Sequence, residues 1–141
     1  MVDRWHKLLA IAAVIILVAT ACSTKEDLAA AEREVEKFHK AYNAAQFDAI
    51  YEKTTDDLKK SASGPEFVGM LETVQRKLGK MTDGKRVDWT VNFGTGGTTV
   101  KLVYETSFER GKGAETFNYR VSGKKVLLMG YNITSKDLLP R

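Results

Sequence analysis

Apolar residues recur every three or four positions between residues 26 and 45. This spacing places them on one face of an amphipathic helix, with charged residues on the other faces. A heptad seam would give the same spacing, but the segment is shorter than the three or four heptads that a coiled coil needs. The predicted buried stripe consists of Leu28, Ala31, Val35, Phe38, Tyr42 and Ala45.

Two further helices are predicted before residue 80. The segment 47–53 is long enough for one short helix, and the polar stretch 56–64 is predicted to interrupt the helical region. Pro65 suits a first helical turn, so it opens a third helix over 65–79, which Gly79 closes. The predicted buried side of this third helix consists of Phe67, Met70, Leu71, Val74 and Leu78.

After residue 84 the apolar period changes to two. Strands are predicted near 87–93, 100–109, 116–121 and 125–133, with glycine-containing turns between them. Such a chain is α+β: three N-terminal helices pack on the apolar face of a curved four-stranded antiparallel meander. The inward positions predicted for the first three strands are Val87, Trp89, Val91, Phe93, Val100, Leu102, Tyr104, Thr106, Phe108, Phe117, Tyr119 and Val121.

This inward set holds no acid or base that titrates near neutral pH, so the inner face is predicted to be neutral and non-catalytic. Asp88 and Glu105 are expected on the outer face, and His39 on a solvated flank of the first helix. Neither metal nor cofactor is expected. Any cavity is expected to be lined by aromatic rings and hydroxyl groups, those of Trp89, Tyr104, Thr106, Tyr119 and Tyr131.

The composition narrows the class of protein further. The chain has 141 residues, of which 43% are hydrophobic, and a net charge of +4. These values indicate one small globular domain. The single cysteine excludes an intramolecular disulfide. The basic residues form no dense stripe, so a nucleic-acid partner is not expected.

The N-terminus has the three regions of an export signal. A basic head, residues 1–7, precedes the uncharged apolar run 8–21, and a polar stretch follows Cys22. The alternative is a transmembrane anchor. Fourteen helical residues reach about 21 Å, whereas the hydrocarbon core of a bilayer is roughly 30 Å thick.

The end of the apolar run, Val18-Ala19-Thr20-Ala21-Cys22, resembles the lipobox of bacterial lipoproteins. The resemblance implies a diacylglyceryl group on Cys22, and Ser23 after the cysteine implies an outer-membrane address. Ala19-Thr20-Ala21 also fits an ordinary signal-peptidase site, which would release a free secreted protein. The domain plan is a signal peptide (1–21), a lipidated tether (22–27), the folded domain (28–135) and a C-terminal tail (136–141).

The folded part resembles the cystatin-like, nuclear transport factor 2-like cone of small exported bacterial domains of unknown function. The matching residues are Gln46-Phe47-Asp48, Tyr51 and Arg76-Lys77-Leu78-Gly79. Enzymes, carriers and scaffolds all use such folds, so the resemblance implies a shape and no particular activity.

The function expected is that of a non-catalytic, envelope-anchored lipoprotein, a binding or interaction module on the periplasmic side of the outer membrane. Its partners would be membrane lipid, through acylated Cys22, and either another envelope protein or a small apolar ligand. Two alternatives stay open. The protein could carry a small apolar ligand in the mouth of the cone, or it could be a small enzyme of the cone class.

Palmitate labelling of wild type and Cys22→Ala tests the lipid anchor. We expect label in the wild type and none in the variant, because the thiol is the acceptor. Equal label in both proteins, or an unlabelled wild type free in the periplasm, would contradict the prediction.

Overall fold

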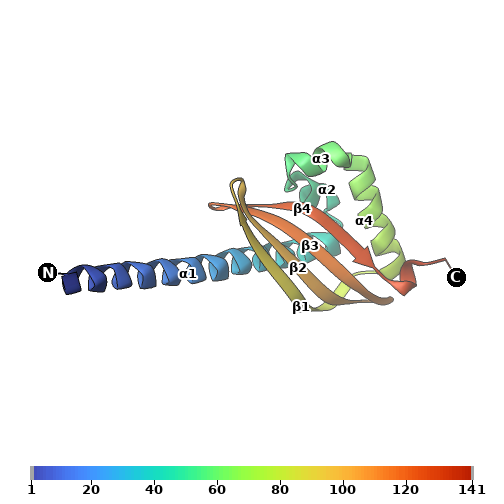
Figure 1. Ribbon diagram of the computed structural model, residues 1–141. Coiled ribbons are helices and arrows are strands. Elements are labelled where there is room, and N and C mark those ends of the chain that lie inside the picture. The colour runs from blue at the N-terminus through green and yellow to red at the C-terminus, as the bar shows by residue number, and fades with distance from the viewer. Residues whose placement is uncertain (1, 141) are drawn as a thin grey trace.

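The computed structural model describes the backbone of residues 2–140 and the side chains of residues 23–140. Helices come first in the chain and an open antiparallel sheet follows, which confirms the α+β prediction (Figure 1). The helices are α1 (Val2–Asn43), α2 (Phe47–Glu52), α3 (Asp56–Ser61) and α4 (Gly64–Leu78). The strands, in the spatial order β1-β2-β3-β4, are β1 (Met81–Gly94), β2 (Gly97–Phe108), β3 (Gly111–Ser122) and β4 (Lys125–Thr134). A short 3-10 helix, η1 (Lys136–Leu138), follows β4.

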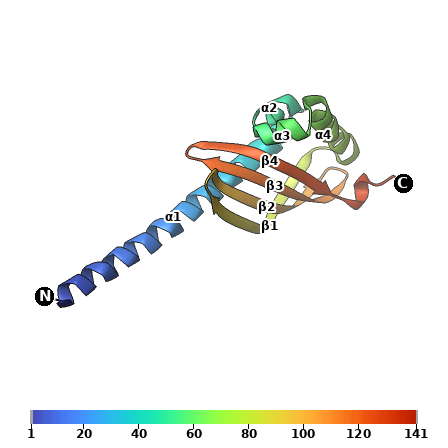
Figure 2. The same ribbon diagram turned by 45° about the horizontal axis from the view of Figure 1, so that its top comes forward.

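Helix α1 contributes the stretch from Ala31 to Tyr42 to the core. Its C-terminal part lies against the sheet, while its N-terminal part projects away from the domain (Figures 1 and 2). Ala31, Val35, Phe38 and Tyr42 of the predicted stripe are buried, as expected. Ala45 lies beyond the end of the helix with a positive φ of 56°. Residues 22–27, predicted as a tether, are helical here as part of α1.

Helix α3 corrects the sequence prediction, which placed a break over 56–64. Thr55 caps this helix, because its side chain accepts a hydrogen bond from the backbone N–H of Leu58. Asp56 and Asp57 occupy the first turn, where negative charge suits the helix dipole. The helix buries none of its residues. It therefore leaves no apolar period in the sequence.

Helix α4 confirms the third predicted helix, beginning one residue early at Gly64. Ser63 and Glu66 form a reciprocal capping box, with proline in the first turn. Gly79 ends the helix with a positive φ of 80°, a conformation that favours glycine. The buried residues are Phe67, Leu71, Val74 and Leu78.

Strand β1 departs from strict alternation. The register shifts between Arg86 and Asp88, so Val87 lies in a bulge and Arg86, rather than Val87, pairs opposite Tyr104. Trp89 pairs with buried Leu102 and therefore keeps the predicted face, yet it is 45% exposed, and Phe93 is 57% exposed. These two side chains are exposed because β1 is an edge strand, on the side of the sheet away from α2, α3 and α4 (Figure 2).

Within the part of the chain that the structure describes, no helix combines the length and apolarity needed to cross a membrane.

Ser63→Ala tests the capping box. We expect the free energy of unfolding to fall by about 1 kcal/mol, because the first turn of α4 loses an acceptor for a free N–H group. Ser61→Ala is the matched control and should change stability by less than about 0.5 kcal/mol, since Ser61 is exposed in α3 and caps no helix start. Urea unfolding followed by circular dichroism measures both. Equal effects would contradict the role assigned to Ser63.

Candidate functional site

A pocket of about 440 Å³ opens between α1, α2 and the strands β3 and β4. The turn after α1 creates it. Ala45 adopts its left-handed conformation there, and the backbone N–H of Gln46 donates to the carbonyl of Ala41 at 2.9 Å. The chain therefore reverses, and α2 returns beside the end of α1.

The walls of the pocket are mainly apolar. They consist of Phe38 and Ala41 from α1, Ala44 from the turn after it, Ala49 and Ile50 from α2, and Tyr119 and Leu128 from the sheet. Its volume lies within the range of about 300–1,000 Å³ that small-molecule sites occupy. The remaining lining residues are polar or charged: Glu34, Lys37, Lys40, Gln46 and Lys53.

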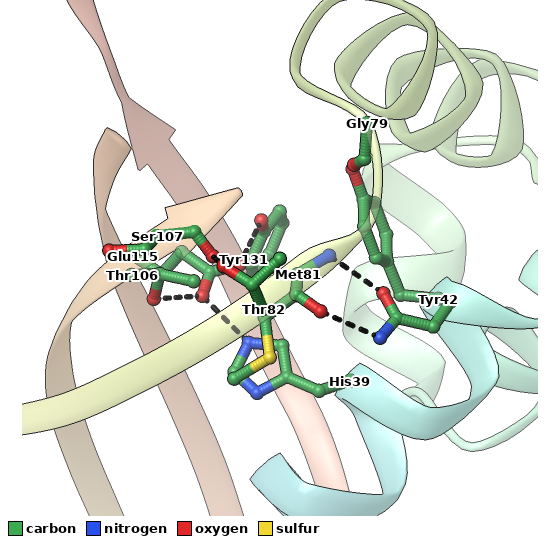
Figure 3. Close-up of polar contacts among 10 residues, drawn as sticks. His39, Tyr42, Gly79, Met81, Thr82, Thr106, Ser107, Glu115 and Tyr131 are labelled. Carbon is green, nitrogen blue, oxygen red and sulfur yellow. Dashed lines mark hydrogen bonds and ion pairs between the residues drawn. The ribbon is translucent and has the colours of Figure 1, made fainter. Parts of the chain in front are cut away.

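A second polar feature lies inside the core and was missed by sequence reasoning. The carboxylate of Glu115, in β3, is 1% exposed. Its Oε2 lies 2.7 Å from His39 Nε2 and accepts a hydrogen bond from Thr106 Oγ1 at 2.6 Å. The Tyr131 hydroxyl donates to Oε1 at 2.7 Å (Figure 3). We call these four residues the Glu115 cluster.

This cluster corrects two predictions. The inner face of the sheet is not neutral, because Glu115 lies on it, and His39 is 6% exposed rather than solvated. Glu115 is two residues before Phe117 and therefore lies on the same face of the strand. It was missed because the predicted strand began at residue 116, whereas β3 begins at Gly111. His39 is covered because the curved sheet reaches around the helix flank. Its ring makes edge contacts with Phe117 at 5.6 Å and Tyr104 at 6.4 Å between centroids.

The cluster is a buried carboxyl group whose two oxygens both have hydrogen-bond partners. The carboxyl oxygens accept from the hydroxyls of Thr106 and Tyr131, and the tautomer of His39 that carries its proton on Nε2 adds a third donor. Burial, followed by the charge of Glu115 and its hydrogen bond, raises the pKa of Tyr131 well above its usual value. Tyr131 therefore stays protonated and keeps donating at neutral pH. Neither Glu115 nor His39 lines the pocket between α1 and α2.

The five predicted cavity-lining residues do not gather around one cavity. Tyr119 lines the pocket between α1 and α2, where burial, and then the charge of Glu34, raises its pKa well above the usual value. Thr106 and Tyr131 contact Glu115, and Tyr104 packs on His39. Trp89 is at the exposed edge of the sheet. The side chain of Cys22 lies outside the described residues.

Asp88 and Glu105 are exposed, as predicted for the outer face. The residues with described side chains include no group of three or more His, Cys, Asp or Glu side chains able to hold a metal ion.

A search with protein-family models and a search of curated proteins both return no match to this chain.

Glu115→Ala tests the cluster. We expect it to lower the free energy of unfolding by about 3–5 kcal/mol, because three buried donors lose their acceptor. Glu105→Ala, an exposed change on the neighbouring strand, is the control and should cost less than about 0.5 kcal/mol. Urea unfolding measures both. If the two variants were equally stable, the cluster would not hold α1 on the sheet.

Proposed function

We propose that this protein is a non-catalytic, envelope-anchored lipoprotein that acts as a binding module, and that its ligand has an apolar body. The observation that carries the proposal is the pocket between α1 and α2, which has apolar walls and a volume of about 440 Å³. The fold we propose is the cystatin-like, nuclear transport factor 2-like cone. The open antiparallel sheet with α1 against it supports this assignment.

The arrangement of the carboxylates supports binding rather than catalysis. General acid–base chemistry needs a titratable group within hydrogen-bond reach of the substrate. The one carboxylate in the lining, Glu34, is paired with Lys37 at 2.6 Å. The buried carboxylate, Glu115, already has three partners and lies outside the lining.

The direction of α1 supports the anchored arrangement. The helix leaves the domain and continues toward the N-terminus, well clear of the sheet (Figure 1). An acyl group on Cys22 would therefore attach to the bilayer without covering the pocket, which begins at Glu34. The proposed location is the periplasmic face of the outer membrane.

A second candidate is contact with another envelope protein. The exposed apolar side chains at the edge of the sheet favour it, since Val87 is 48% exposed and Trp89 and Phe93 are comparable. This edge and the pocket are separate, because none of these three residues lines the pocket. Variants can therefore distinguish a ligand in the pocket from contact at the edge.

Native mass spectrometry of the full chain, released from detergent and titrated with decanol, tests the pocket. We expect one bound decanol in the wild type and at least a tenfold weaker complex in Ala49→Trp, because an indole on α2 fills the pocket. Ala114→Trp, an exposed change outside the lining, controls for the added ring and should bind like the wild type.

Trp89→Ser completes this experiment. It should leave decanol binding unchanged, because Trp89 lies at the sheet edge. Loss of binding in Trp89→Ser with retention in Ala49→Trp would place the ligand at the sheet edge instead. No decanol binding in the wild type would contradict the proposed function.

A further inference from the structure

We propose that the ligand of this pocket is a single-chain amphiphile with an anionic head, a carboxylate or a phosphate at one end of an apolar chain. This inference rests on the proposed binding function and adds the charge of the ligand. Its basis is the charge balance of the lining, which holds three lysines, Lys37, Lys40 and Lys53, against one acid, Glu34.

These lysines are not equivalent. Lys37 has a partner in Glu34, at 2.6 Å between Nζ and Oε1. Among residues 23–140, no salt bridge involves Lys40 or Lys53. Two ammonium groups of the lining therefore lack a carboxylate partner among the residues whose side chains are described.

The two lysines belong to two different walls of the pocket. Lys40 comes from α1, and Lys53 is the C-terminal cap of α2. Both are exposed residues, so their ammonium groups reach water while their carbon stems extend the apolar wall. A ligand whose chain lies on Phe38, Ile50 and Leu128 would then place its head at the rim, within reach of cations from both sides.

This arrangement discriminates by charge. An anionic head stays solvated at the rim and gains attraction to two cations, so its desolvation cost is small. A neutral head gains no such attraction, and a cationic head is repelled. The apolar wall alone would bind the chain equally well whether the head is anionic, neutral or cationic. The lysines therefore decide which head is preferred.

The experiment measures full-chain binding by native mass spectrometry with four ten-carbon probes: decanoate, decyl phosphate, decanol and decyltrimethylammonium. Each affinity is taken as a ratio of variant to wild type, so that partition of a probe into detergent cancels. The variant is Lys40→Met with Lys53→Met, which keeps the apolar stems and removes both charges. The control is Lys101→Met with Lys125→Met, which removes the same net charge from exposed positions outside the pocket.

We expect Lys40→Met with Lys53→Met to weaken decanoate or decyl phosphate roughly tenfold, the combined effect of two exposed charge contacts. Decanol should bind the variant as it binds the wild type, and decyltrimethylammonium should bind the variant better. The control pair should change no ratio by more than about twofold. The anion whose affinity falls more in this variant identifies the head as a carboxylate or a phosphate.

Glu34→Gln supplies a test in the opposite direction. Removing this carboxylate releases Lys37 and subtracts a negative charge from the lining, so both anions should bind a few-fold more tightly while decanol is unchanged. Decanol binding without any charge preference would overturn this inference and leave the proposed function standing. Failure of all four probes to bind would overturn both.

Discussion

A carboxylate buried inside an apolar core has to be surrounded by hydrogen-bond donors, and this requirement organises the domain. Glu115 is in β3, and its three partners come from three other elements: His39 from α1, Thr106 from β2 and Tyr131 from β4. The cost of leaving such a charge unpaired is several kcal/mol. Helix α1 and three strands are therefore held in one mutual arrangement.

The apolar packing around the cluster depends on the same arrangement. Phe38 precedes His39 on α1 and packs edge-on against Phe117, with 5.0 Å between ring centroids. It also lies 4.8 Å from the ring of Tyr131. The contact that places His39 against Glu115 therefore also places Phe38 in the core. Because Phe38 forms part of the pocket wall, the buried cluster positions the pocket without taking part in it.

The domain thus separates two kinds of polar chemistry. The polar groups of the core bond to one another and to the backbone, and no buried side-chain N or O atom of residues 23–140 lacks a partner. The lysines at the pocket rim are exposed, and two of them have no carboxylate partner within the described part of the chain. Under the proposed function, the first set keeps the pocket walls in place and the second set meets the ligand.

The amino-acid sequence by itself determined the helices with strong periodicity and the antiparallel meander. The stripe through Val35 and Tyr42 and the end signals of α4, Pro65 and Gly79, are local features, so they can be recognised in the sequence without knowledge of the fold. Helix α3 was missed because none of its residues is fully buried, and the bulge at Val87 because alternation assumes an unbroken register.

The site itself was decided by tertiary structure. Tyr119 was predicted to line a cavity and does line the pocket, but the other walls come from two helices joined by a turn at Ala45, a position that the apolar period assigned to the first helix. His39 and Glu115 are 76 positions apart in the chain. A pattern read along the chain shows which face a residue takes, whereas burial and partners depend on what the curved sheet brings over that face.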